Sequence, residues 1–456
     1  MSILKKQNKL IFCLRLAFYL MIFSFLIHNS FEYLDPDFGW HLAAGQQVIN
    51  EKTVPTTNLE NFTIYGAEWV DHEWLADAGA YAIYNKFGYA MLTIIFALIM
   101  ILTLILLNIF TQNFFVKNKN SLSSIIYIMV WQSFGVLAMS PHLGIRMQEI
   151  TILNLLLLFI ILYSAYKTEK IKTLFWLLPL FFFWANLHAG FLIGLVILFS
   201  FVGLEIIKKI FAKLNILTPL DYKDLLIYIT VAFLSAGATL FTPYGIKLYS
   251  FLAGYSNNFY LSYISEWLSF YRCPIIYTQI FYFAIFTGLV IIWLFIGQRA
   301  REKNKFNLFL FIWAIIFLFL AMKSRRHFPL FFVSSFPFII FFLNHEIGRP
   351  LNFKSSKLKK FLIVYVFACL LTVSVYFLLD AKWTDDPWLE NKTCREYPCE
   401  AINFLKNDPK YLSEKMFNFY GWGGYLTWNW PEKKLFIDGR MPQYEFRGHS
   451  LLEEYY

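Results

Sequence analysis

The residues nearest the N-terminus that could do chemistry form one short stretch, from Asp35 to Gly45. Two carboxylates, an indole and an imidazole lie within its first seven positions. Pro36 disfavours helix at Asp35 and suits the first turn of a helix that starts behind it. Asp35 is therefore the predicted N-cap, and Asp37 falls in the first turn, where the helix dipole favours a negative charge. His41 follows Asp37 at i and i+4, so the stretch predicts an amphipathic helix with an acidic and imidazole edge.

Paired carboxylates in a water-facing loop suit two tasks. They can take a proton from an acceptor, or they can hold a divalent cation such as Mg²⁺ or Mn²⁺ through oxygen ligands. We predict that Asp35 and Asp37, with His41 beside them, are catalytic, and that the two aspartates are the ligands if a cation binds. The simpler alternative is an N-cap with ordinary loop acidity. We expect Asp77, in the same loop, to contribute far less.

A second acidic pair, Asp71 and Glu73, lies in the same loop. His72 and Glu73 begin like the zinc motif HExxH, but residue 76 is alanine where the second histidine belongs, which excludes that class of zinc protease. We assign Glu73 to substrate binding.

Three consecutive basic residues, Arg325-Arg326-His327, form a second candidate site, called here the basic turn. The planar guanidinium of arginine binds phosphate through two parallel hydrogen bonds, so the basic turn is predicted to hold a phosphate. The simpler alternative is that it anchors a helix end to lipid headgroups. Further predicted substrate-binding residues are Arg146, His188 and Glu266.

The composition excludes an ordinary soluble protein. Of the 456 residues, 58% are hydrophobic, 21% are aromatic and only 15% are charged. The mean hydropathy is +0.51 and the net charge is +10. A soluble domain cannot bury so much apolar surface, so the chain is predicted to be an all-α polytopic protein of a lipid bilayer. A nucleic-acid partner is not expected.

Apolar runs of about the length that crosses a bilayer predict about 11 transmembrane helices. They lie near residues 10–30, 89–110, 122–139, 149–166, 173–187, 190–210, 224–241, 276–297, 306–322, 327–344 and 360–380.

The positive residues predict the orientation. If the N-terminus is cytoplasmic, the connections on that side hold 21 lysines and arginines and the opposite connections hold 8. An odd number of spans then places the tail outside. Residues 1–380 form the predicted transmembrane module, with an outer loop over 31–88, and residues 381–456 form a soluble extracytoplasmic tail. The candidate residues all fall on the outer side.

The tail is predicted to be a small α/β domain. A helix starts at Pro398, and residues 415–419 and 434–437 are predicted strands. A disulfide between Cys394 and Cys399 is one option in this part of the chain. The sequence stops at Tyr456 just after a helix start, as a truncated tail would.

Several motifs, in their order along the chain, resemble bacterial membrane glycosyltransferases of the GT-C superfold. This group includes the catalytic subunit of oligosaccharyltransferase, protein O-mannosyltransferases and the aminoarabinose transferase of lipid A. The motifs that carry the resemblance are the Asp35-Pro36-Asp37 loop and the segments 37–45, 184–191, 242–245, 325–330 and 423–426. The chain lacks the WWDYG-like signature of oligosaccharyltransferases, so N-glycosylation is not implied.

The resemblance implies a transferase that takes a sugar from a polyprenyl-phosphate-linked donor. The acceptor would be a lipid-linked glycan or a protein at the outer face of the bacterial cytoplasmic membrane. By the same implication Asp35 or Asp37 is the base or metal ligand, and Arg325 or Arg326 holds the carrier phosphate. Two other functions stay open, namely a transporter or flippase of lipid-linked glycans and a non-catalytic assembly subunit.

Overall fold

The structure is a computed structural model of the whole chain. It describes residues 2–116, 121–168, 170–211, 220–254, 260–270, 272, 277–296, 308–344, 356–388, 393–440 and 444–456. The connections 297–307 and 345–355, which carry part of the predicted charge asymmetry, lie outside the described residues.

Contacts divide the chain into two compact units, each assembled from three segments. Unit 1 comprises 1–33, 93–145 and 268–383, and unit 2 comprises 34–92, 146–267 and 384–456. The predicted boundary at residue 380 separates the transmembrane module from the extracytoplasmic tail. The division into compact units does not test it.

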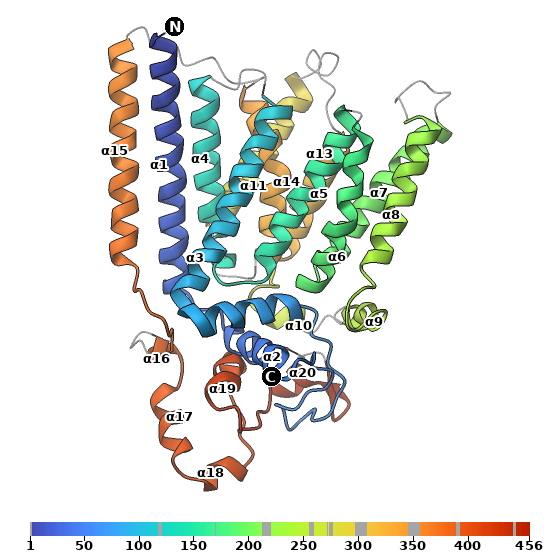
Figure 1. Cartoon of the computed structure of the whole chain (residues 1–456), viewed down its shortest axis with the longest axis vertical. Helices are drawn as coiled ribbons and strands as arrows, with labels where there is room; N and C mark the ends of the chain where they lie inside the picture. Colours follow the sequence, from blue (N-terminus) through green and yellow to red (C-terminus); the bar gives the residue numbers. More distant parts are fainter. Residues whose placement is uncertain are drawn as a thin grey trace. The chain divides into compact units, whose positions relative to one another are not determined.

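Unit 1 is built from long apolar helices (Figure 1). They are α1 (Ser2–Glu32), the second part of α3 (Trp74–Phe114), α4 (Leu122–Met139), α11 (Tyr277–Ile296), α13 (Leu308–Lys323), α14 (Phe328–Phe342) and α15 (Ser356–Asp380). Two short 3-10 helices, η1 (Ser140–His142) and η4 (Arg325–His327), also belong to this unit. α1 and α15 lie side by side, with His28 Nε2 at 2.7 Å from Asp380 Oδ2.

The core of unit 1 surrounds α14, whose residues are all buried. A helix that is apolar on every side needs neighbours on every side. α4, α11 and α13 supply them. Gly135 of α4 allows the closest approach, because a Cβ there would lie 1.9 Å from the ring of Phe332.

Unit 2 combines apolar helices with shorter elements. Its elements are α2 (Phe38–Glu51), the first part of α3, α5 (Gln148–Thr168), η2 (Ile171–Trp176), α6 (Leu177–Leu187), α7 (Phe191–Ile210), α8 (Tyr222–Ala238), α9 (Lys247–Gly254), α10 (Tyr260–Tyr263), α16 (Thr393–Glu396), α17 (Cys399–Lys406), α18 (Lys410–Ser413), η6 (Tyr420–Trp422), α19 (Gly423–Asn429), β1 (Glu445–Phe446), β2 (His449–Ser450) and α20 (Leu451–Tyr455). α6 packs against α8, and α2 packs against α19.

The helix α3 is broken at Gly88. Its φ of 78° lies in the region that favours glycine, and a Cβ there would lie 2.8 Å from the side chain of Asp385. Glycine is therefore required at this position. The break falls close to Leu92, where unit 2 ends along α3.

The described helices support a membrane protein, although not the predicted number of spans. Six described helices are long and apolar enough to cross a membrane, and they are Lys9–Glu32, Trp74–Phe114, Leu122–His142, Gln148–Thr168, Phe191–Ile210 and Lys360–Asp380. Shorter apolar helices cover Ile171–Leu187, Thr278–Ile292 and Phe309–Lys323. α8 and α14 occupy two further predicted spans, with 17 and 15 residues. The count of eleven is therefore not confirmed.

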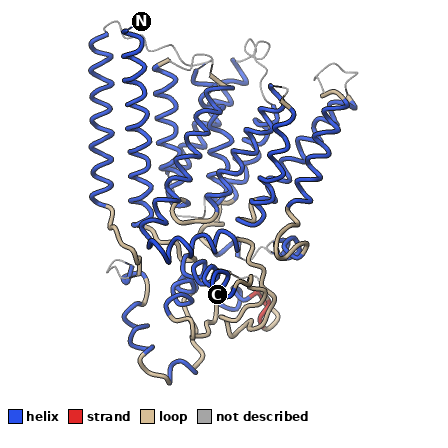
Figure 2. The backbone as a smooth tube through the Cα atoms, viewed as in Figure 1, coloured by secondary structure: helices blue, strands red, loops and turns tan. Residues whose placement is uncertain are grey.

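The tail is more helical than predicted (Figure 2), and the two predicted strands are wrong. Within the described residues the tail's regular sheet is the hairpin of β1 and β2, with Arg447 and Gly448 at positive φ in its two-residue turn. The segments predicted as strands are linked instead by one side chain. The amide of Asn418 donates to the carbonyl of Ile437 at 2.9 Å and accepts from the N–H of Phe436 at 2.9 Å. The backbone of Leu435 pairs elsewhere, in an isolated bridge with Asn61.

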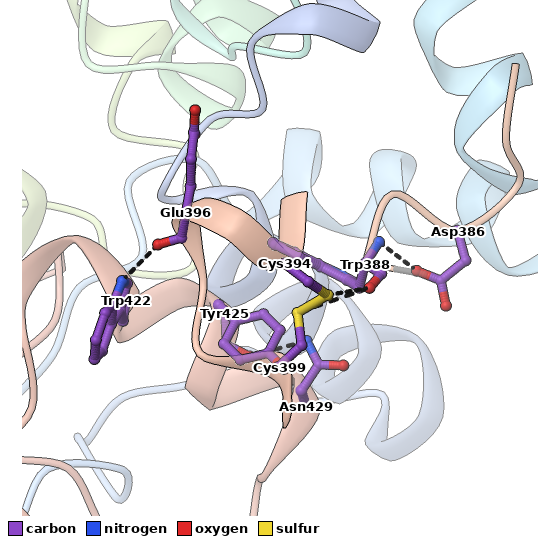
Figure 3. The surroundings of a disulfide bond; sticks show 8 residues. All are labelled: Asp386, Trp388, Cys394, Glu396, Cys399, Trp422, Tyr425 and Asn429. Atoms are coloured by element: carbon purple, nitrogen blue, oxygen red, sulfur yellow. Dashed lines mark hydrogen bonds between the residues drawn. A yellow bond between two sulfur atoms is a disulfide. The ribbon is translucent and has the colours of Figure 1, made fainter. Parts of the chain in front are cut away.

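A disulfide joins Cys394 and Cys399 in the tail, with a Cα–Cα distance of 5.2 Å (Figure 3). The ring of Tyr425 packs edge-on against that of Trp388, at 5.1 Å between centroids. The indole of Trp422 donates to the carbonyl of Glu396 at 2.9 Å. The disulfide therefore restrains the segment around Trp388, which packs on α19.

Candidate functional site

The loop before α2 is held by the first of its two aspartates. Asp35 Oδ1 accepts a hydrogen bond from the N–H of Asp37 at 2.9 Å, and the carbonyl of Asp35 accepts from Phe38 at 3.1 Å. The helix begins at Phe38 with Asp37 as its N-cap residue. The predicted helix is therefore present but starts two residues later than the N-cap prediction at Asp35, because the Asp35 side chain closes a turn of its own. Its first two turns are buried on every side, so the predicted amphipathic pattern is not confirmed there.

Asp35 also belongs to an ion-pair triad with Arg146 and Glu266. Arg146 Nε lies 3.1 Å from Asp35 Oδ2, and its Nη1 donates to Glu266 Oε1. Burial lowers the pKa of Arg146, but the carboxylates of Asp35 and Glu266 outweigh it and raise that pKa above its usual range. The structure thus brings together three predicted site residues from distant segments. It also surrounds the guanidinium with carboxylates, which does not favour a phosphate there in this conformation.

Asp37 lies partly buried where the tail packs on the loop. A Cβ on Gly439 would lie 2.0 Å from Asp37 Oδ1, so the tail backbone passes directly over this carboxylate. A Cβ on Gly424 would lie 2.2 Å from the carbonyl of Pro36. Burial and the charge of Asp35 together raise the pKa of Asp37 to about 7. A carboxyl group that titrates near neutral pH is suited to proton transfer.

His41 faces the first turn of α3. Its Nδ1 lies 2.7 Å from Asp77 Oδ1 and 3.7 Å from Glu73 Oε2, and all three residues are buried. Burial lowers the pKa of His41, but Asp77 and Glu73 outweigh it and raise that pKa to about 10. We call His41, Glu73 and Asp77 the α2–α3 cluster. Glu73 immediately precedes α3, and its carbonyl accepts the N–H of Asp77 at 3.0 Å, so the two residues are one helical turn apart.

The second oxygen of Glu73 faces two more imidazoles. Glu73 Oε1 lies 3.3 Å from His72 Nε2 and 3.4 Å from His188 Nε2. Burial raises the pKa of Glu73, but His188, His72 and His41 outweigh it and bring that pKa below its usual range. Glu73 is therefore an ionised carboxylate among imidazoles.

The turn before α7 fixes the proton of His188. Its Nδ1 accepts the backbone N–H of Gly190 at 2.9 Å and lies 2.8 Å from the hydroxyl of Thr151. The indole of Trp184 donates to the same hydroxyl at 3.0 Å. Because a backbone N–H can only donate, Nδ1 is the acceptor and Nε2 carries the hydrogen that points at Glu73. The segment 184–191 therefore positions Glu73 through His188.

The basic turn belongs to unit 1, whereas the other predicted site residues belong to unit 2. It forms η4 between α13 and α14, and the N–H of Arg325 donates to the carbonyl of Leu268 at 3.2 Å. Burial and the neighbouring charge of Arg326 together lower the pKa of His327 to about 4.

The prediction from sequence overlooked Asp77, which we had expected to contribute little. The sequence could have indicated Asp77, because it follows Glu73 by four residues, which is about one helical turn. Among the described residues, the α2–α3 cluster is the group of three donor side chains that lies close enough to share one ion. A cation at Asp35 and Asp37 stays a prediction.

Comparison with models of known protein families and with curated protein sequences found no match to this chain. The site therefore has to be interpreted from its own chemistry.

Proposed function

We propose that the chain is a membrane glycosyltransferase. It would transfer a sugar from a polyprenyl-phosphate-linked donor to a lipid-linked glycan or a protein acceptor at the outer face of the bacterial cytoplasmic membrane. The observation that carries the proposal is Asp37, a partly buried carboxyl group at the start of α2 with a pKa raised to about 7. The order of the GT-C-like motifs along the chain supports it.

In the proposed reaction the acceptor hydroxyl oxygen attacks the anomeric carbon of the donor. Asp37 takes the hydroxyl proton, and the bond from the anomeric carbon to the phosphate oxygen breaks, so that the lipid phosphate leaves with the electron pair. Asp35 is held by Arg146, which suits it to positioning the loop rather than to taking the proton. That Arg325 or Arg326 holds the carrier phosphate stays a prediction from the sequence, and its chemical reason is that a phosphate oxyanion needs a positive partner.

The proposed topology has eleven spans, a cytoplasmic N-terminus and an extracytoplasmic tail. The predicted cytoplasmic connections hold 21 lysines and arginines and the opposite connections hold 8, which favours this topology. The disulfide between Cys394 and Cys399 agrees with it, because disulfides persist in oxidising compartments outside the cytoplasm.

The topology can be tested with single cysteines at two exposed positions, Glu51 and Lys223. The background replaces Cys13, Cys273 and Cys369 with serine and keeps the tail disulfide. An impermeant maleimide added to intact cells should label Glu51→Cys and should label Lys223→Cys only after permeabilisation. The reverse pattern would overturn the topology.

The transfer proposal can be tested with purified full-length protein in lipid nanodiscs and a panel of short-chain polyprenyl-phosphate sugars. Wild type should release the lipid phosphate and pass the sugar to an acceptor glycolipid. Asp37→Asn should be slower by about 10²-fold or more, since loss of a general base has that size of effect. Glu51→Gln changes an exposed carboxylate of the same helix and should stay near the wild-type rate.

Two outcomes would replace the proposal. Movement of the intact donor across the bilayer without cleavage would indicate a flippase. Wild-type protein that neither cleaves nor moves any donor would indicate an assembly subunit.

A further inference from the structure

We propose that His41, Glu73 and Asp77 bind one divalent transition-metal ion of the zinc or manganese class. The site lies within unit 2, between α2 and the first turn of α3. It stands on the geometry of these three side chains and does not rest on the transferase proposal.

The spacing of the donor atoms fits one ion. One donor atom from each residue lies within 4.8 Å of the others. Two ligands of a tetrahedral zinc ion lie about 3.4 Å apart, given metal–ligand distances near 2.1 Å. The contacts of His41 Nδ1 with Asp77 and Glu73, at 2.7 and 3.7 Å, bracket that value. Shifts of less than about 1 Å would complete the coordination.

The donor types select the class of ion. One imidazole nitrogen with two carboxylates suits zinc, manganese or ferrous iron, whereas calcium takes six to eight oxygen ligands. Three protein ligands also leave a coordination position for water or a substrate, which is typical of catalytic rather than structural zinc sites.

Asp77 provides a second, independent observation. Its side chain is fully buried, and its Oδ2 has no hydrogen-bond partner among the described residues. A buried carboxylate oxygen without a partner is costly, so such atoms are normally paired or bound to a metal. Its sister oxygen Oδ1 contacts His41, so the unpaired oxygen belongs to a carboxylate already turned into the cluster.

The backbone brings the two helices to the distance that the site needs. A Cβ on Gly45 would lie 2.1 Å from the carbonyl oxygen of Asp77 and 2.8 Å from the Cβ of Tyr81. Gly45 therefore sets the close approach of α2 and α3. His41 lies one turn before Gly45 on the same helix, which places its ring against Asp77.

A second residue orients the Glu73 ligand. His188 Nε2 lies 3.4 Å from Glu73 Oε1, and its own Nδ1 accepts the N–H of Gly190. His188 is therefore a positioning residue rather than a ligand. Partners of this kind fix the direction of a metal ligand, and their loss typically lowers metal affinity about 10–100-fold.

The test is metal binding by the purified full-length chain with its affinity tag removed. The protein is stripped with EDTA, desalted, equilibrated with Zn²⁺ or separately with Mn²⁺, and passed through gel filtration before elemental analysis. Titration then gives the affinity. Wild type should retain about one ion per chain. Asp77→Asn and Glu73→Gln should bind at least about 100-fold more weakly, and His188→Gln about 10–100-fold more weakly.

Glu51→Gln is the matched control, because it removes an exposed carboxylate of α2 outside the cluster. It should bind like wild type. Thermal unfolding guards against misfolded variants, since added Zn²⁺ should raise the melting temperature of wild type and of the control but not of Asp77→Asn. If wild type retains no ion, the cluster is an ion-pair network. If Asp77→Asn and Glu73→Gln retain as much as wild type, the binding is adventitious. Either result overturns the proposal.

Discussion

Two histidines in two parts of the molecule show how the same side chain acquires opposite properties. His41 is surrounded by Asp77 and Glu73, which raise its pKa to about 10 against the effect of burial. His327 is half-buried, and burial together with the neighbouring charge of Arg326 lowers its pKa to about 4. Carboxylates reverse the effect of burial on the pKa of His41, whereas burial and a neighbouring arginine both lower the pKa of His327. The α2–α3 region therefore suits a cation, and the basic turn suits an anion.

The largest expected effect comes from removing the partner of His41. Asp77→Asn should lower the free energy of unfolding by about 3 kcal/mol, because loss of one member of a buried ion pair leaves the other uncompensated. Chemical unfolding of the purified protein in detergent measures it. Glu51→Gln, on the exposed end of α2, should change the free energy by less than about 0.5 kcal/mol. Equal effects of the two variants would contradict a buried ion pair at His41.

Two glycines test whether the close approach of α2 and α3 builds the cluster. Gly45→Ala should destabilise the protein by about 2 kcal/mol, since the added carbon meets the backbone of Asp77. Gly79→Ala, in α3 and with open space around it, should stabilise by about 0.5 kcal/mol. Thermal unfolding of both variants measures the difference. A stabilising Gly45→Ala would mean that the helices do not touch there.

The basic turn offers a smaller effect. Arg325→Lys and Arg326→Lys should differ, because successive side chains on a helical turn point apart and only one needs to reach a phosphate. Lysine does not reproduce the two-pronged bond, so one variant should bind a short-chain polyprenyl-phosphate sugar about tenfold more weakly. The other, which anchors to headgroups, should bind like wild type. Wild-type affinity in both variants would make the turn an interfacial anchor, and the phosphate would have to be held elsewhere.

The smallest expected effects are losses in the free energy of unfolding over two pH ranges, measured with a chelator present. His41 has a raised pKa in the folded state, so its contribution is complete below pH 6.5 and is lost as the pH rises toward about 10. His327 has a lowered pKa, so stability is lost as the pH falls from about 6.5 to 4.

Matched variants separate the two ranges in chemical unfolding curves. His41→Gln should remove the pH dependence of the free energy of unfolding in the alkaline range alone. His327→Gln should remove it in the acid range alone. If both variants remove it in the same range, the comparison of the two histidines is wrong.

The sequence was sufficient for the helix at Asp37 and for its acidic and imidazole edge, because these depend on local spacing. It could not predict that Arg146 pairs with Asp35, since the two residues are 111 positions apart and the contact arises from packing. Asp77 was overlooked for the same reason, because its partner lies on another helix. The predicted strands are wrong because the side chain of Asn418 joins the two segments, while the backbone of Leu435 pairs with the distant Asn61.

The pH dependence of transfer by wild type and Asp37→Asn tests the central claim most directly. The base must be ionised to accept a proton, so the wild-type rate should rise through an apparent pKa near 7 and level off above it. Asp37→Asn should be slower by about 10²-fold and should lack this rise. A variant that keeps the wild-type rate and the same pH profile would show that the loop before α2 is not the catalytic centre.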